Sequence, residues 1–195
     1  MLKSKIEKYM NNHKVDGKIA LYKEEVSFYI EKGIVSQEEI VEVKEEKRFS
    51  DLYLELANKE TDELIVDEVE ASFLNDQIHY LETNLDQYIY VESSAFQMIS
   101  TESFILEVDS VFKSYELLLG LQLQKKFEKD IRSFIEDALE GDNIRYSLMF
   151  NGQEGLWEVN LPLEKINGFN KEMTVSEAIK LAYLFLFDLN KSLDK

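Results

Sequence analysis

The chain has no cysteine, one proline and seven glycines among its 195 residues. Without cysteine it forms no disulfide and no thiolate metal site, and it offers no cysteine nucleophile. Such a composition fits a reducing compartment, so we expect a cytoplasmic protein. Because the proline and the glycines are scattered, no flexible linker divides the chain, and we expect residues 1–195 to form a single domain.

Long apolar runs and a basic surface are also lacking. The longest fully apolar run, Leu181 to Phe187, is far shorter than the ~20 residues of a membrane-spanning helix. The first residues lack the apolar core and the small-residue cleavage site of a signal peptide. The chain carries 22 basic and 39 acidic residues, whereas proteins that bind nucleic acids present a basic face. We therefore expect neither a membrane nor a nucleic acid as its partner.

Sequence motifs that hold phosphates, nucleotides or catalytic metals are absent. The chain has no G-x-G-x-x-G, no G-x-x-x-x-G-K-[ST], no G-x-S-x-G and no H-E-x-x-H. We therefore expect no bound cofactor. Gly152 and Gly155 fit a hairpin turn, because neither a nearby lysine nor a following helix accompanies them as in a phosphate-binding loop.

Basic residues are missing from one long stretch rather than from the whole chain. Residues 51–109 carry 15 acidic side chains and 1 basic side chain, while residues 1–50 carry 10 of each. No Lys or Arg occurs between Glu60 and Phe112, a span with 13 carboxylates. We call residues 60–112 the acidic segment. It is also rich in Phe, Tyr, Ile, Leu and Val, so we expect folded surface and not a solvated acidic tail.

A charge of one sign in a folded segment suits a binding protein. Opposed potentials speed the encounter with a basic partner and disfavour wrong partners. We therefore predict an acidic binding or accessory protein that engages a basic protein partner, as inhibitors, immunity proteins and chaperones do. The candidate contact residues are the carboxylates at the start of the acidic segment: Asp62, Glu63, Asp67, Glu68 and Glu70.

One histidine offers an alternative function. A helix over 62–81 would place Asp76, His79 and Glu82 within roughly a third of its circumference. A carboxylate–histidine pair orients an imidazole as a base or binds a divalent ion, which would make the protein a metal- or carboxylate-dependent enzyme. The competing interpretation is an ordinary histidine on the surface of a helix among acids.

Apolar spacing and capping sequences predict several helices. For 62–81 we favour a helix, although a hairpin that pairs 52–57 with 64–70 is the alternative. The run from Leu181 to Phe187 is apolar all round, which indicates burial on more than one side or a contact in a homo-oligomer. The predicted helices cover 3–12, 18–32, 37–47, 62–81, 111–140 and 175–190.

Alternating apolar residues predict strands, and their order indicates the fold class. The strands are expected at 52–56, 88–92, 104–108, 144–150 and 157–161. Asn151-Gly152 is a strong turn signal between the last two, because both residues tolerate positive φ. Strands and helices do not alternate regularly, so we predict an α+β fold. Its antiparallel sheet of four to five strands should pack against the long helix at 111–140 and the buried helix at 175–190.

Overall fold

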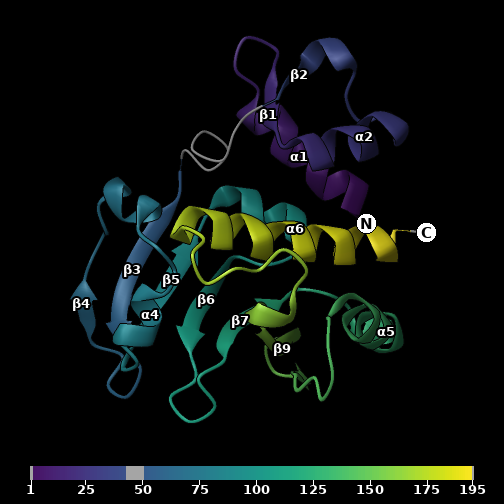
Figure 1. Ribbon diagram of the computed structural model, residues 1–195. Coiled ribbons are helices and arrows are strands. Elements are labelled where there is room, and N and C mark those ends of the chain that lie inside the picture. The colour runs from purple at the N-terminus through teal and green to yellow at the C-terminus, as the bar shows by residue number, and fades with distance from the viewer. Residues whose placement is uncertain (1, 43–50, 195) are drawn as a thin grey trace.

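The fold is built around an antiparallel sheet of seven strands in the order β4-β3-β5-β6-β7-β9-β8 (Figure 1). The computed structural model describes residues 2–42 and 51–194. The predicted α+β class is confirmed, although the sheet is larger than the four to five strands expected. The strands are β3 Tyr53–Asn58, β4 Leu64–Val66, β5 Gln87–Glu92, β6 Ser103–Val108, β7 Tyr115–Leu121, β8 Ser147–Asn151 and β9 Leu156–Pro162.

One face of this sheet is buried under α6, which runs across it in Figure 1. Side chains along β6 alternate, so that Phe104, Leu106 and Val108 are buried while the intervening residues are half-buried on the outer face. The helices are α1 Leu2–His13, α2 Lys23–Glu31, α4 Tyr80–Thr83, α5 Glu128–Ala138 and α6 Val175–Leu193. The 3-10 turns are η1 Gln37–Glu39, η2 Ala71–Asn75, η3 Ser94–Ile99, η4 Lys125–Phe127 and η5 Leu163–Lys165. Among the described residues, no helix combines the length and the apolarity that crossing a membrane requires.

The buried C-terminal helix predicted over 175–190 is confirmed as α6. It begins at a capping box, in which the Glu177 N–H donates to Thr174 Oγ1 at 3.1 Å and the Thr174 N–H donates to the Glu177 carboxylate at 2.7 Å. Beside the sheet, α6 packs against α2 through Phe187 and Phe28, whose ring centroids are 5.6 Å apart. This internal packing accounts for the apolar run from Leu181 to Phe187, and a homo-oligomer stays a prediction.

The N-terminal part of the chain forms a small unit next to α6. Its strands β1 Ile19–Leu21 and β2 Ile40–Glu42 pair in parallel. The carboxylate of Glu25 in α2 is fully buried, where it accepts hydrogen bonds from the Tyr22 N–H at 2.7 Å and from the Tyr183 hydroxyl of α6 at 2.6 Å. Buried side chains of this unit and of the large sheet belong to one continuous apolar cluster.

Two N-terminal helix predictions are wrong in part. The helix expected over 18–32 is divided, because residues 19–21 form β1 and the helix α2 begins only at Lys23. The capping box at Ser36 is present, but it starts a 3-10 turn of three residues that passes into β2. The parallel pairing of β1 with β2 decides both cases, and the remainder of the helix expected over 37–47 lies outside the described residues.

The long helix predicted over 111–140 is wrong in its first half. Residues 115–121 form β7, which pairs with β6 on one side and with β9 on the other, and only 128–138 are α-helical. The apolar residues of 115–121 fit both a strand and a helix, and the two neighbouring strands select the strand. Gly120 lies close to β9: a Cβ at this position would meet Leu156 Cδ2 at 3.2 Å.

The helix favoured over 62–81 is also wrong, and the hairpin alternative is confirmed for 64–66, although 67–70 are not part of the strand. Leu64–Val66 pairs with β3 in antiparallel orientation, with Leu56 opposite Val66. Asp62 and Glu68 adopt left-handed backbone conformations with φ of 55° and 53°, which a helix does not accept. The turns η2 and α4 occupy the rest of this range.

Candidate functional site

The outer face of β3 and β5 carries a checkerboard of tyrosines and glutamates. Each strand contains a Tyr-x-Glu sequence, Tyr53-Leu54-Glu55 in β3 and Tyr90-Val91-Glu92 in β5. Antiparallel pairing places Tyr53 opposite Glu92 and Glu55 opposite Tyr90. Residues two apart point to the same side of a strand, so all four side chains share one face.

Asp67 joins this face from the segment after β4. The Tyr53 hydroxyl lies 2.7 Å from Asp67 Oδ1 and is also within hydrogen-bond distance of Glu55 Oε1. The hydroxyl has one proton, so it donates to one carboxylate at a time and leaves the other without this donor. Hydrogen bonds to Glu55 and Asp67, together with their negative charge, raise the pKa of Tyr53 above its ordinary value.

Two further tyrosine–carboxylate pairs extend the face. The Tyr90 hydroxyl donates to Glu92 Oε2 at 2.9 Å, and the Tyr88 hydroxyl lies 3.5 Å from Asp62 Oδ1. Partial burial raises the pKa of Tyr88, and the Asp62 carboxylate adds to this effect. The tyrosine hydroxyl groups therefore stay protonated near neutral pH and donate hydrogen bonds to the carboxylates. We call the whole set the tyrosine–carboxylate face: Tyr53, Glu55, Asp62, Asp67, Tyr88, Tyr90 and Glu92.

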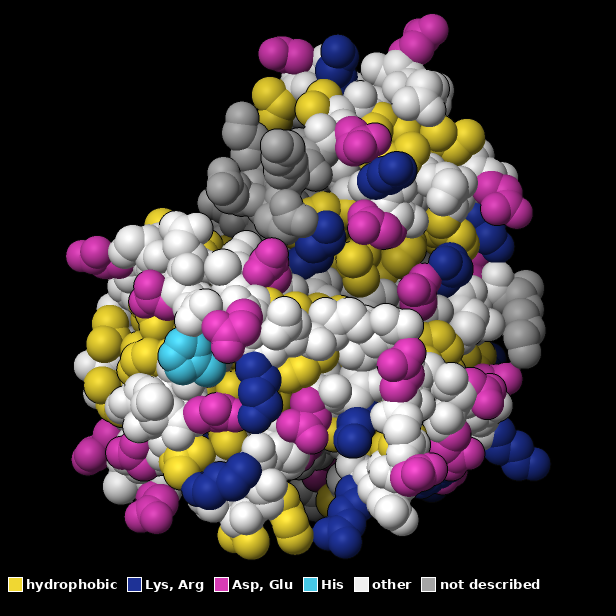
Figure 2. Space-filling view, viewed as in Figure 1, with side chains coloured by type: hydrophobic (Ala, Val, Ile, Leu, Met, Phe, Trp, Pro, Cys, Tyr) yellow, Lys and Arg dark blue, Asp and Glu magenta, His cyan; other side chains and the backbone are white. Residues whose placement is uncertain are grey.

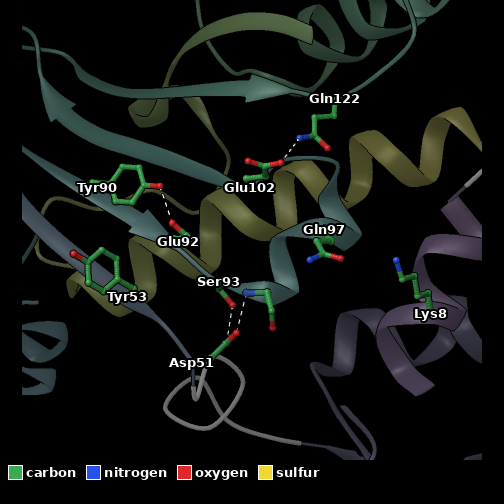
Figure 3. A pocket seen from close by; sticks show the side chains of 10 residues that line it. Lys8, Asp51, Tyr53, Tyr90, Glu92, Ser93, Gln97, Glu102 and Gln122 are labelled. Atoms are coloured by element: carbon green, nitrogen blue, oxygen red, sulfur yellow. Dashed lines mark hydrogen bonds between the residues drawn. The ribbon is translucent and has the colours of Figure 1, made fainter. Parts of the chain in front are cut away.

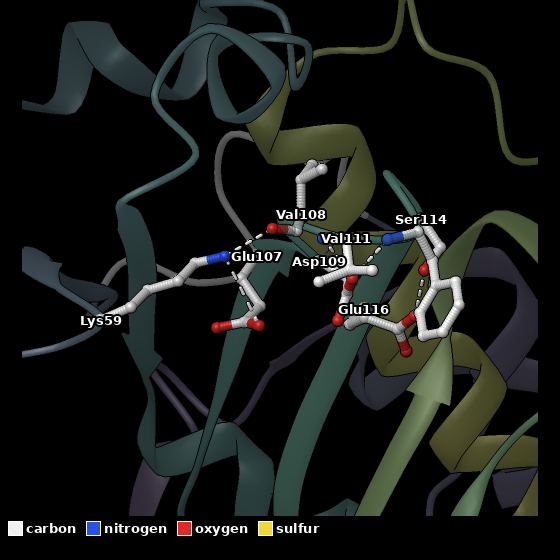
Figure 4. Close-up of polar contacts among 8 residues, drawn as sticks. Lys59, Glu107, Val108, Asp109, Val111, Ser114 and Glu116 are labelled. Atoms are coloured by element: carbon white, nitrogen blue, oxygen red, sulfur yellow. Dashed lines mark hydrogen bonds and ion pairs between the residues drawn. The ribbon is translucent and has the colours of Figure 1, made fainter.

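Lys59, the one Lys or Arg of 51–109, pairs with none of the carboxylates of this face, although its partner Glu107 stands next to the face, opposite Tyr88 (Figure 4). Its ammonium group lies 3.5 Å from Glu107 Oε1 and donates to the Val108 carbonyl. Glu107 stands directly opposite Glu116 of β7, whose pKa is raised by burial and by neighbouring carboxylates, including Asp109 and Glu107. Lys59 therefore offsets the repulsion between Glu107 and Glu116, which face each other across β6 and β7.

A polar pocket of about 610 Å³ opens at the end of the tyrosine–carboxylate face (Figure 3). Tyr53, Tyr90 and Glu92 line it on one side, and Lys8 reaches toward it from α1. Asp51, another lining residue, accepts hydrogen bonds from the Ser93 hydroxyl at 2.9 Å and the Ser94 N–H at 2.8 Å. The pocket thus holds one cation, Lys8, among the three carboxylates of Asp51, Glu92 and Glu102.

The five carboxylates predicted to contact a partner lie around β4, and all are exposed. The structure brings two of them, Asp62 and Asp67, to the tyrosine–carboxylate face through Tyr88 and Tyr53. The other three, Glu63, Glu68 and Glu70, stay near the edge strand, and within the described part of the chain none of them is hydrogen-bonded to these tyrosines. Sequence reasoning missed the tyrosines and their glutamates, although the Tyr-x-Glu sequence in each of two predicted strands was a usable signal.

The single helix expected to carry Asp76, His79 and Glu82 does not form, and the catalytic alternative itself stays a prediction. Because 62–81 is not one helix, Asp76 lies at the end of η2 while Glu82 lies in α4. The Glu82 carboxylate pairs with Lys171, and this hydrogen bond lowers its pKa. Within residues 2–42 and 51–194, no group of three or more His, Asp or Glu side chains is placed to hold a metal ion.

Carboxylates next to tyrosine rings can hold lysine and arginine side chains. The carboxylates accept charge-assisted hydrogen bonds, and a ring face attracts the same cation.

No protein-family model and no curated protein sequence matches this chain, and no solved structure matches its fold. Its function is therefore inferred from the tyrosine–carboxylate face and the pocket beside it.

Proposed function

We propose that the protein is a cytoplasmic binding or accessory protein, of the inhibitor, immunity or chaperone type, that engages a basic protein partner through the tyrosine–carboxylate face. One observation carries the proposal: the Tyr53 hydroxyl stands between Glu55 and Asp67 and satisfies only one of them at a time. Across the described residues, no Lys or Arg forms an ion pair with Glu55, Asp67 or Glu92. A cation from a partner would supply the missing donor.

The composition of the face also suits protein binding. Tyrosine is enriched at protein interfaces, because its ring buries a large area while its hydroxyl keeps a polar contact. A lysine or arginine above this checkerboard would meet a carboxylate and a ring together. The negative potential of the acidic segment would also accelerate the encounter at low ionic strength.

A double variant that replaces two carboxylates of the face with neutral amides tests the proposal with a defined peptide. The double variant Glu55→Gln/Glu92→Gln keeps side chains that accept hydrogen bonds from Tyr53 and Tyr90 but removes two charges. We expect it to bind a fluorescein-labelled hexapeptide of alternating arginine and serine about fivefold more weakly than the wild type at low salt. Fluorescence anisotropy measures the dissociation constant at low and at high salt.

The matched control removes the same charge from the N-terminal unit. Glu38→Gln/Glu42→Gln changes two exposed carboxylates there. Its affinity should stay within about twofold of the wild-type value, because neither carboxylate belongs to the tyrosine–carboxylate face that the peptide is expected to contact. Equal weakening of both double variants, or binding that salt does not change, would show that the tyrosine–carboxylate face is only solvated surface.

A further inference from the structure

Strand β4 ends the sheet with three exposed apolar residues. The exposed fractions of Leu64, Ile65 and Val66 are 52%, 47% and 40%. Figure 2 shows hydrophobic side chains at the surface on the flank where Figure 1 places β4. Side chains of a strand alternate between the two faces of a sheet, so this strand exposes apolar surface on both faces.

The outer side of β4 is an open hydrogen-bonding edge. In the described sheet β4 pairs only with β3, and no side chain of residues 2–42 or 51–194 donates to or accepts from the backbone of residues 64–66. The unpaired N–H and C=O groups of an edge strand form a template for another strand. Lysine or proline often protects such an edge, and residues 60–70 contain neither, although β4 is only three residues long and its pairing with β3 has a register shift.

Carboxylates frame the apolar residues on both sides. Glu63 precedes Leu64–Val66, and Asp67 and Glu68 follow it. If two copies of the chain paired in antiparallel orientation about Ile65, Glu63 of each copy would stand opposite Asp67 of the other. Like charges directly opposite each other destabilise a strand pair. This edge therefore disfavours a second copy and favours a strand with basic flanks.

We propose that the outer edge of β4 binds an extended basic segment of the partner by strand addition. Main-chain hydrogen bonds to residues 64–66 supply the affinity, and apolar side chains of the segment pack on Leu64, Ile65 and Val66. Lysine or arginine at its ends pairs with Glu63, Asp67 and Glu68. The inference rests on the proposed function, and Asp67 connects the edge to the tyrosine–carboxylate face.

The test uses a labelled peptide, Lys-Lys-Val-Thr-Val-Lys-Lys, and a copy whose three central peptide nitrogens are methylated. The two peptides have the same charge, but the copy cannot donate backbone hydrogen bonds. We expect the full-length protein to bind the methylated copy about tenfold more weakly. With the parent peptide bound, amide hydrogen exchange within residues 64–66 should slow down.

Matched protein variants locate the binding edge. Ile65→Lys places a positive charge on β4, and Met149→Lys places the same charge on an exposed apolar position of the other edge strand, β8. The first variant should bind the parent peptide about tenfold more weakly, and the second within about twofold of the wild type. Both positions are exposed, so neither change disturbs the core, and thermal unfolding verifies the fold.

The outcomes separate this inference from the proposed function. Equal binding of parent and methylated peptides, with weaker binding by Glu55→Gln/Glu92→Gln, overturns strand addition and leaves the face proposal standing. Weaker binding of the methylated peptide, with full binding by that double variant, supports strand addition and contradicts the role of the face. Slow exchange at 64–66 in the protein alone, together with concentration-dependent dimerisation, would identify a second copy as the occupant and overturn the inference.

Discussion

The two edges of the sheet are built in opposite ways. At β8, Arg132 of α5 donates from Nη2 to the Leu148 carbonyl at 3.1 Å, so a cation covers part of that edge. At β4, three exposed apolar residues stand among carboxylates, and within the described part of the chain no side chain reaches their backbone. One edge is protected against pairing, and the other is selective for what it pairs with.

The charges near each edge follow the same division. Near β8, Lys125 lies 5.5 Å from the ring centroid of Phe150, and Arg132 pairs with Glu128 at 3.1 Å. The acidic segment around β4 has no basic residue of its own. Near β8, Glu128 thus has an internal counter-ion, whereas among the described residues no Lys or Arg pairs with Glu63, Asp67 or Glu68 beside β4.

The largest change in stability is expected when Arg132, which covers part of the β8 edge, is removed. Arg132→Ala removes the donor to the Leu148 carbonyl and the contact with Glu128, which should lower the free energy of unfolding by about 1.5 kcal/mol. Urea unfolding measures this loss, and sedimentation velocity should reveal new self-association at β8. If the Arg132→Ala protein is as stable and as monodisperse as the wild type, the arginine does not protect the edge.

A smaller change in stability is expected at the Glu107–Glu116 pair, which joins β6 of the acidic segment to β7. Glu116 has a pKa raised by burial and by nearby carboxylates, so its ionisation destabilises the folded state above that pKa. Glu116→Gln should therefore raise the free energy of unfolding at pH 7 by about 1 kcal/mol, the upper end for a like-charge cross-strand pair. As the pH falls below the ordinary glutamate pKa, the two proteins should become equally stable. A gain that persists at pH 3 would point to a cause other than charge.

The smallest stability effect is expected at the end of β4. Glu68 has a φ of 53°, which glycine adopts without the steric cost of a Cβ. Glu68→Gly should raise the free energy of unfolding by about 0.5 kcal/mol and weaken binding of the lysine-flanked peptide. Lys113→Gly, at a φ of 58° in the β6–β7 turn, is the matched control, with a similar gain in stability and unchanged binding. Equal binding by both variants would remove Glu68 from the contact.

Local sequence was sufficient to predict those elements whose residue pattern fits only one type of secondary structure. The alternation on each side of the expected turn predicted β8 and β9 close to their observed bounds, although the positive φ of the turn falls at Gly155 and not at Asn151 or Gly152. The Thr174 capping box and the apolar run behind it predicted α6. The sequence also located the acidic segment, because charge is read directly from composition.

Tertiary pairing decided what local pattern left open. The spacing of the apolar residues in 115–121 fits both a helix and a strand. Pairing with β6 on one side and β9 on the other selects the strand. The candidate site depended on register: only the alignment of β3 with β5 sets Tyr53 against Glu92 and Glu55 against Tyr90. A shift of β3 by one residue would have sent Tyr53 and Glu55 to the buried face, away from Tyr90 and Glu92. The sequence by itself determined which charges the molecule carries, and only the paired sheet decided which of them share a surface.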